Sequence, residues 1–295
     1  MKKYDEHDYI TYPRRFNAYR WYKPLLIALL SFVFYLACIF LIEVLTKLMF
    51  NTTISSSGYD DMDLFTSAGA FYNGTTASIL IPCILLAALI VKDRPVSSYF
   101  SSMGGWRWRV FLNTLLVGVL IVFIPNAIRF ALKGRTGDIR FTIGGFILLT
   151  LLVPFQGLAE ELTYRSYFMQ TFGSWFKLPI VGLIIQILAF TAVHPYNLTG
   201  IISIAISALI YGMVCILSKG LEACTVLHIM NNMSELLMTG FGFGLLTADQ
   251  TVFDSIFNLV TKALVFAFIF YANKKLHWFD EIKRDDVAEF NARKS

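Results

Sequence analysis

Charged residues are scarce in this sequence. Asp, Glu, Lys and Arg make up 15% of its 295 residues, whereas soluble globular chains contain about 25%. This shortage argues against an ordinary soluble domain, and the chain is short enough for a single domain. The net charge of +5 at neutral pH is small. Because the basic residues collect in the tails and a few loops, they favour contact with lipid headgroups, and we expect no nucleic-acid partner.

Cysteine and histidine are also rare. The four cysteines are widely spaced and no CxxC pair occurs, so we expect neither a disulfide framework nor a thiolate zinc site. Only four histidines are present, of which two, His194 and His228, fall within apolar segments. The sequence contains no HExxH motif, and the first apolar run, which begins near Pro24, is too long for the core of a cleavable signal peptide.

Long hydrophobic runs fill most of the chain, in which 56% of residues are hydrophobic. About 20 apolar residues in a helix cross the hydrocarbon core of a bilayer, and helices satisfy their own backbone groups there. We therefore predict an all-α, polytopic membrane helix bundle with about eight transmembrane helices. The predicted spans are residues 24–45, 70–91, 110–132, 141–172, 178–194, 198–217, 221–240 and 255–272.

The distribution of Lys and Arg predicts the orientation. Basic residues crowd into the tail 1–23, the loop after the second span and the start of the tail 274–295, whereas residues 51–69 contain aspartates but no Lys or Arg. By the positive-inside rule both tails are cytoplasmic and the protein lies in the cell membrane. The connection between spans three and four is an exception, because it contains Lys133, Arg135 and Arg140.

The first polar cluster in the late spans runs from Glu160 to Arg165. Ionisable groups within a membrane cost a few kcal/mol or more and are candidate functional residues. On a helix Glu161 and Arg165 are four residues apart, in the favourable acid-first order for an ion pair. Glu160 is rotated about 100° away, which leaves it free for chemistry. Alternatively, both glutamates lie at headgroup level at the end of a long helix.

The second and third clusters contain the two apolar-segment histidines. If spans four and five form a hairpin, its turn lies near residues 177–179, and position 177 is midway between Glu160 and His194. These two residues would then lie at the same depth, although His194 could also be a snorkelling residue at a helix end. His228 and Asn232 share a helix face, with Asn231 as a near competitor. Hydrogen bonding between membrane helices is the alternative for this pair.

The three clusters together resemble the signature of the CPBP intramembrane protease family. This family includes the CAAX prenyl endopeptidases and the bacterial bacteriocin-processing and self-immunity (Abi) proteins. The resemblance covers about residues 157–232 and implies a membrane-embedded protease domain at 24–273, with its motif core at about 141–240. The matching motifs are Glu160-Glu161-x-x-x-Arg165, Phe190-x-x-x-His194 and His228-x-x-x-Asn232.

The resemblance implies an intramembrane endopeptidase of the glutamate type. In such an enzyme Glu160 and His194 would activate a water for attack on a peptide carbonyl. His228 and Asn232 would stabilise the resulting oxyanion. Three further residues are implied to support the site structurally: Glu161, Arg165 and Phe190.

The resemblance leaves the metal open, because family members have been described both as metalloproteases and as metal-independent enzymes. Glu160, His194 and His228 could form a His₂Glu zinc set, but we expect no required cofactor. The expected partners are the lipid bilayer and a membrane-associated peptide or lipidated protein, in bacteriocin or leader-peptide processing or in self-immunity. The alternatives are a catalytically silent scaffold or immunity protein of the same fold and a proton-coupled transporter. The absence of an obvious internal repeat disfavours the transporter.

Overall fold

The computed structural model describes residues 8–52, 63–244 and 251–293, and these residues form helices joined by loops and contain no β-strand. Short π-helical segments join α4 to α5 (Val119–Phe123) and α6 to α7 (Leu162–Phe168), and Ala272–Leu276 extends α11. The α-helices are α1 (Lys23–Phe50), α2 (Ser67–Ser78), α3 (Leu80–Val91), α4 (Trp108–Gly118), α5 (Ile124–Lys133), α6 (Ile143–Glu161), α7 (Met169–Phe176), α8 (Pro179–Ala192), α9 (Leu198–Ser218), α10 (Glu222–Gly240), α11 (Val252–Tyr271) and α12 (Asp286–Ala292).

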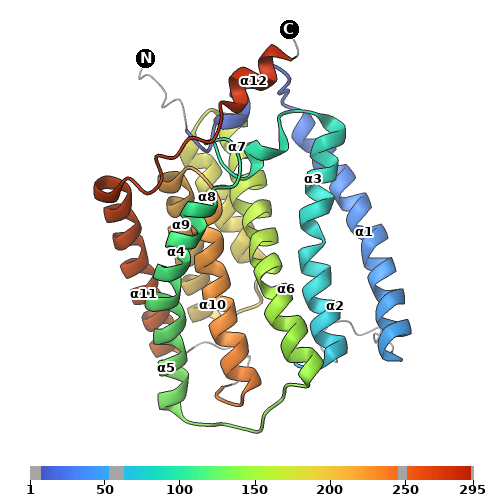
Figure 1. The fold of residues 1–295 in the computed structure, drawn as a ribbon, viewed down its shortest axis with the longest axis vertical. Helices are drawn as coiled ribbons and strands as arrows, with labels where there is room; N and C mark the ends of the chain where they lie inside the picture. Colours follow the sequence, from blue (N-terminus) through green and yellow to red (C-terminus); the bar gives the residue numbers. More distant parts are fainter. Residues whose placement is uncertain (1–7, 53–62, 245–250, 294–295) are drawn as a thin grey trace.

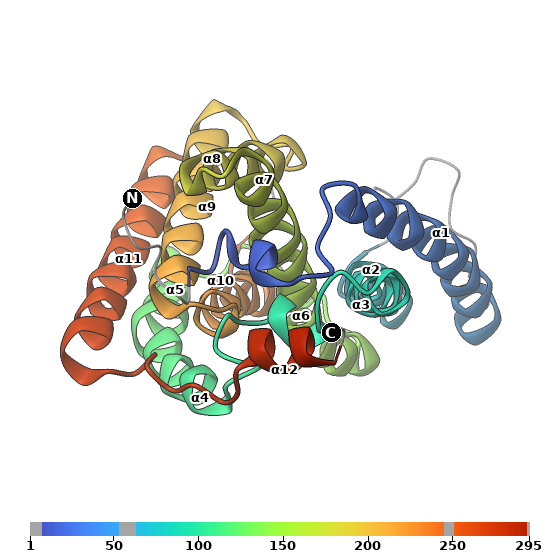
Figure 2. The same ribbon diagram turned by 90° about the horizontal axis from the view of Figure 1, so that it is seen from above.

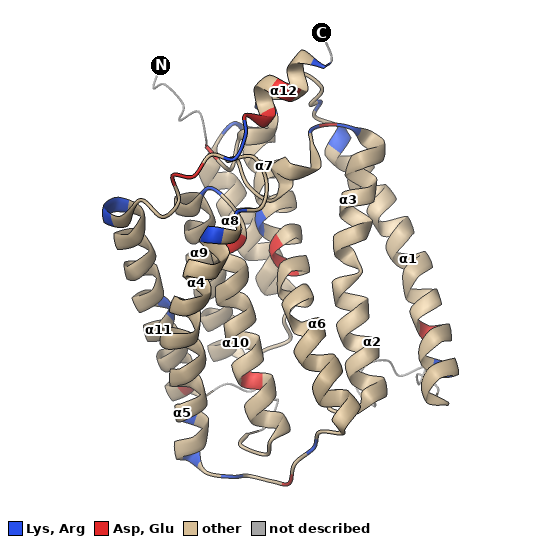
Figure 3. Ribbon diagram, viewed as in Figure 1, with Lys and Arg blue, Asp and Glu red and all other residues tan. Residues whose placement is uncertain are grey.

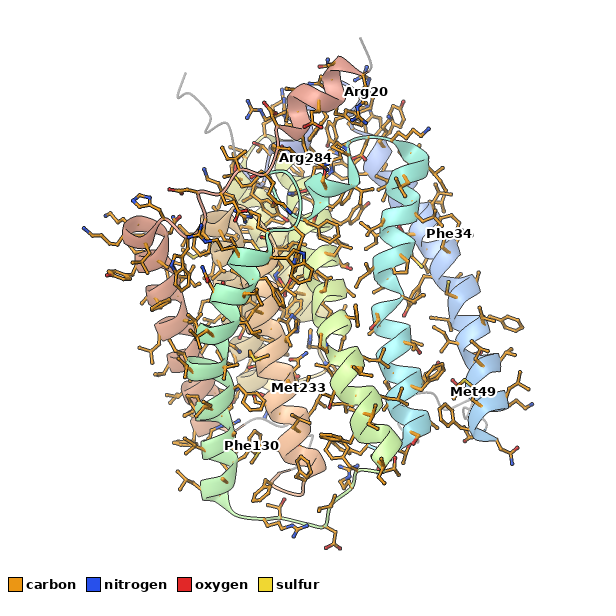
Figure 4. All side chains as sticks on the ribbon, viewed as in Figure 1. Arg20, Phe34, Met49, Phe130, Met233 and Arg284 are labelled. Carbon is orange, nitrogen blue, oxygen red and sulfur yellow. The ribbon has the colours of Figure 1, made fainter. Side chains whose placement is uncertain are left out.

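The long helices run side by side as a bundle (Figure 1). Seen from above, α10 lies near the middle, and it contacts α4, α5, α6 and α9, whereas α1 lies at one edge (Figure 2). Large apolar side chains cover the outside of the bundle, as Met49 does at the lower end of α1 (Figure 4). An apolar exterior is what a lipid environment requires, because hydrocarbon cannot solvate polar groups.

The predicted all-α, polytopic bundle is confirmed. Two of the eight predicted spans differ from the rest, since α8 is apolar but has only 14 residues and α10 is the polar centre of the bundle. In the described part of the chain, six helical segments are long and apolar enough to cross a membrane: Lys23–Phe50, Ser67–Val91, Trp108–Lys133, Ile143–Phe176, Leu198–Ser218 and Val252–Leu276.

The predicted hairpin between the fourth and fifth spans is present. Helix α7 ends at Phe176, and the next residue, Lys177, adopts a left-handed backbone with φ of 57°. Helix α8 then begins at Pro179 and packs back against α7. Proline suits this position because the first residues of a helix have no intrahelical N–H bond to lose.

The two described ends of the chain lie at the same end of the bundle (Figure 1). The rings of Phe16 and Phe290 are 5.6 Å apart, and the Asn291 side chain accepts a hydrogen bond from the backbone N–H of Asn17. A chain that crosses a membrane an even number of times has both of its ends on the same side. Lys and Arg are frequent at this end, with a smaller group near the lower end of α5 (Figure 3).

Two of the three basic residues that break the predicted charge pattern, Lys133 and Arg140, have acidic partners. Lys133 and Arg129 of α5 both pair with Asp254 at the start of α11. Arg140, in the loop before α6, lies 3.0 Å from a carboxylate oxygen of Asp63. These ion pairs join α5 to α11 and the loop before α6 to the residues before α2, so Lys133 and Arg140 have a structural role.

A buried ion pair fixes the other end of α10. Arg107 and Glu222 are both fully buried, and the guanidinium binds both carboxylate oxygens at 2.9 Å. Arg107 also donates to the carbonyls of Ser218 and Phe279. These contacts join the residues before α4 to α9, α10 and the segment after α11. This arginine therefore stabilises the fold and does not bind lipid headgroups.

We expect Arg107→Ala to destabilise the protein by about 3–5 kcal/mol, since it leaves the Glu222 carboxylate buried without a partner. Thermal unfolding in detergent measures this. The neighbouring Arg109→Ala is the control, because Arg109 is exposed and its loss should change stability by less than about 0.5 kcal/mol. Equal unfolding temperatures for the two variants would contradict the assignment.

Candidate active site

A polar cavity of about 290 Å³ lies inside the apolar bundle. It is bounded by α6, α9, α10 and α11, with the end of α8 and the residues after it closing one side. The lining residues are Gln156, Glu160, Phe190, His194, Tyr196, Ser203, Ile204, Ser207, Tyr211, His228, Asn231, Asn232, Glu235, Leu236, Asn258 and Lys262.

The two adjacent glutamates occupy different environments. Glu160 lines the cavity, its side chain is 21% exposed, and Gln156 donates a 3.3 Å hydrogen bond to it. Glu161 is fully buried behind the cavity wall, 3.1 Å from the Arg165 guanidinium. The helix becomes π-helical at Leu162, directly after this pair, and such turns are frequent at functional sites. Glu160 therefore faces the cavity, and Glu161 forms the ion pair with Arg165 that their spacing predicts.

His228 of α10 lies between the two glutamates. Its Nδ1 is 2.7 Å from Glu161 Oε1, and its Nε2 is 3.6 Å from Glu160 Oε2. With a hydrogen on Nδ1 donated to Glu161, Nε2 is the nitrogen that faces the cavity. The sequence prediction assigned Glu161 to Arg165 alone, so its contact with His228 is a role that sequence reasoning missed.

His194 reaches the cavity from the segment after α8. The helix ends at Ala192, because a residue that precedes a proline disfavours the α conformation and Pro195 follows His194. The carbonyl of Phe190 therefore has no helical N–H partner, and His194 Nδ1 lies 2.7 Å from it. If Nδ1 donates its hydrogen to this carbonyl, Nε2 keeps a lone pair, as a base or a metal ligand requires.

Asn232 supplies the amide that the motif predicts. It lies one helical turn after His228 and lines the cavity. Its Oδ1 accepts a long hydrogen bond, 3.4 Å, from the amide of Asn231. The Asn232 NH₂ group can therefore donate to a group bound in the cavity. Asn231 also lines the cavity, so both asparagines named from the sequence are present at the site.

Phe190 and Arg165 form the packing behind the histidines. The Phe190 ring is buried, 4.6 Å from the His194 ring and 6.1 Å from the His228 ring. The Arg165 guanidinium is also fully buried, and its central carbon lies 4.3 Å from the centre of the Phe190 ring. The Phe190 side chain thereby fixes the positions of both imidazoles.

The donor types at the cavity fit a metal better than their spacing does. A carboxylate or carbonyl behind each imidazole, as at His228 and His194, is common at zinc sites. However, zinc ligands at about 2.0–2.1 Å from the ion lie within about 3.5 Å of one another, and the ligand atoms of Glu160, His194 and His228 do not all lie within 4.8 Å. Since Glu160 and His228 are 3.6 Å apart, His194 is the distant member.

A different group does meet that spacing. Within the described residues, Glu161, Cys215 and Cys224 have ligand atoms that all lie within 4.8 Å of one another. All three are buried, and the glutamate already contacts Arg165 and His228. The thiols of Cys215 and Cys224 are both fully buried in the hydrophobic core of the bundle.

The motif-bearing part of the chain matches a known protein family. Residues 142–234 match the family model described as type II CAAX prenyl endopeptidase Rce1-like. The predicted resemblance to the CPBP intramembrane protease family is confirmed. The matched segment contains every residue that the sequence analysis assigned to the site.

One curated relative and the solved structures give further comparison. The chain is 28% identical over 167 residues to the uncharacterized protein YyaK of Bacillus subtilis (strain 168), an alignment that covers 52% of this chain and 55% of that protein. The chain therefore spans about half the length of the curated relative that it matches. No solved structure matches.

The cavity extends beyond the CPBP-like segment. Glu235 follows that segment directly, and Asn258 and Lys262 lie on α11, well outside it, yet all three line the cavity. The sequence offered one signal for Asn258 and Lys262, namely two polar residues four apart in an apolar helix. Their meeting with α10 depends on how α11 packs, which the sequence pattern does not encode.

Proposed function

We propose that the protein is an intramembrane endopeptidase of the CAAX-protease type. It hydrolyses a peptide bond in a membrane-associated peptide or lipidated protein. The observation that carries this proposal is a polar cavity inside an apolar bundle, in which Glu160, two imidazoles and the Asn232 amide converge. A scaffold or immunity protein of this fold has no need of such a converging set.

Glu160 and His194 activate the attacking water in this mechanism. Glu160 accepts a proton from a water that His194 Nε2 helps to hold, and the resulting hydroxide oxygen bonds to the scissile carbonyl carbon. When the C–N bond breaks, the carboxylic acid of Glu160 returns the proton to the leaving amine. A base positioned in this way contributes about 10²–10⁴-fold to the rate.

His228 and Asn232 stabilise the oxyanion. In this role Asn232 donates from its NH₂ group. His228 acts as an imidazolium, which donates from Nε2–H to the oxyanion and from Nδ1–H to Glu161, and the second contact keeps the ring in place. Donors held ready in a site surrounded by apolar helices act more strongly than they would in water, because the local dielectric is low.

We place the protein in the cell membrane with both termini in the cytoplasm, and we assign residues 24–273 to one membrane-embedded domain. The substrate then reaches the cavity from within or beside the bilayer. Processing of a bacteriocin or leader peptide, or self-immunity, is the cellular role that we propose. No cofactor is required in this mechanism, since Glu160 is the base.

Purified protein in detergent should cleave members of a quenched peptide panel that contains prenylated and unprenylated forms of each sequence. Comparison of the two forms identifies the substrate class. Cleavage by wild-type protein that disappears in Glu160→Ala and His194→Ala supports the proposal. Inactivity of wild type on every peptide, together with a cellular phenotype that survives Glu160→Ala, would favour the scaffold function instead.

A chelator such as EDTA or 1,10-phenanthroline should change the initial rate of that cleavage by less than about twofold. The reason is that the mechanism uses the carboxylate of Glu160 directly, and the wide spacing of His194 disfavours a three-ligand zinc site. Loss of activity in chelator that added Zn²⁺ restores would overturn this prediction and assign Glu160, His194 and His228 as the ligands.

A further inference from the structure

The far wall of the cavity contains a cation that the proposed mechanism does not use. Lys262 of α11 is buried, with 7% of its surface exposed, and it lines the same cavity as Glu160 and His228. An ammonium group in the interior of a membrane protein is costly and marks a functional position unless it is fully paired.

The contacts of Lys262 leave it able to bind a further group. Its Nζ donates a 2.6 Å hydrogen bond to the Ser207 hydroxyl. Within the described residues no carboxylate lies within 4.0 Å of this nitrogen, and an ammonium carries three N–H donors.

Tyr211 relates this wall to the proposed reaction centre. The centre of its ring lies 5.8 Å from the His228 ring and 6.0 Å from Lys262 Nζ. The distance from Lys262 Nζ to the centre of the His228 ring is therefore at most the sum of these two distances. An extended peptide covers about 3.3–3.6 Å per residue, so about three residues bridge the gap.

We propose that Lys262, whose ammonium is held by the Ser207 hydroxyl, forms a subsite for a carboxylate of the peptide substrate. The carboxylate lies within about three residues of the scissile bond. A charge-assisted hydrogen bond in a cavity of low dielectric is strong and favours a carboxylate over a neutral group. The inference rests on the proposed peptidase function and makes Lys262 a specificity-determining residue. The carboxylate can belong to the chain end or to an acidic side chain.

Substitution of Glu235 offers a second test of the same subsite, with the opposite expected effect on the preference for a carboxylate. The Glu235 side chain lines the cavity from α10, and its carboxylate attracts the Lys262 ammonium electrostatically. No oxygen of this carboxylate lies within 4.0 Å of the ammonium, so a substrate carboxylate and Glu235 would both interact with the same positive charge. Removal of the Glu235 charge should therefore strengthen the preference for a carboxylate, whereas removal of the Lys262 charge should abolish it. A purely structural pair would not move the preference in opposite directions.

The test uses three peptides with one scissile sequence: a free C-terminal acid, a C-terminal amide, and an amide that ends in Glu. We compare kcat/KM for each with wild type, Lys262→Met, Lys262→Arg and Glu235→Gln. Wild type should prefer one of the two carboxylate peptides over the plain amide by about tenfold or more. That ratio should fall to about one in Lys262→Met, be partly kept in Lys262→Arg, and rise in Glu235→Gln.

Lys274→Met is the matched control, since this lysine lies beyond α11, outside the cavity, and its loss should leave the ratio unchanged. Equal ratios in wild type and Lys262→Met would overturn the subsite while the peptidase function stands. If wild type cleaves none of the peptides, the proposed function fails, and fluorescence polarisation of labelled peptides then decides the subsite alone. Acid-dependent binding that Lys262→Met abolishes supports it, and binding that ignores the carboxylate rejects it.

Discussion

Glu160→Gln is expected to lower kcat for peptide cleavage by about 10²–10⁴-fold, with little change in stability. The amide has nearly the shape of the carboxylate but cannot accept the proton of the attacking water. Glu160 is partly exposed to the cavity, and its contacts with His228 Nε2 at 3.6 Å and with Gln156 at 3.3 Å are both long, so its replacement should cost little stability. Initial rates on a cleavable peptide, with thermal unfolding of the same samples, measure both quantities.

The matched control is Glu43→Gln, the same substitution at an exposed position of α1 outside the cavity. It should keep the wild-type rate. If Glu160→Gln retained more than about a tenth of the wild-type kcat, Glu160 would not be the base, and the water would have to be activated by another group in the cavity.

Glu161→Gln should have a different signature, with loss of both stability and activity. Glu161 is fully buried, and its carboxylate contacts the Arg165 guanidinium and His228 Nδ1. The substitution leaves the guanidinium buried without a charged partner, which costs about 3–5 kcal/mol. It also weakens the hold on His228, so the oxyanion donor loses its position. A fall in unfolding temperature together with a fall in kcat is the expected result.

The double variant Glu161→Gln/Arg165→Met separates these two effects. Without the buried guanidinium no uncompensated charge remains, so part of the lost stability should return. Activity should not return, because His228 still lacks its carboxylate acceptor. Recovery of both quantities together would show that Glu161 acts only through Arg165, as the sequence alone had indicated.

The sequence predicted the features that depend on local pattern. Apolar run length predicted the helices, because a segment that must satisfy its backbone in lipid has few other conformations available. The turn at Lys177–Leu178 followed from the break in apolar pattern, and from it came the matched depth of Glu160 and His194. The acid-first spacing of Glu161 and Arg165 predicted their ion pair, since helix geometry alone brings them together.

Tertiary packing determined the contacts between helices. The rotation of α10 brings His228 to Glu161, 67 residues earlier in the chain, and the packing of α11 on α9 brings Lys262 to Ser207. Arg107 shows the same limit, because its neighbours in sequence resemble an interfacial segment while its carboxylate partner lies 115 residues away. A single sequence specifies which residues share a helix face, but not which helix that face meets. That depends on the close packing of many side chains at once.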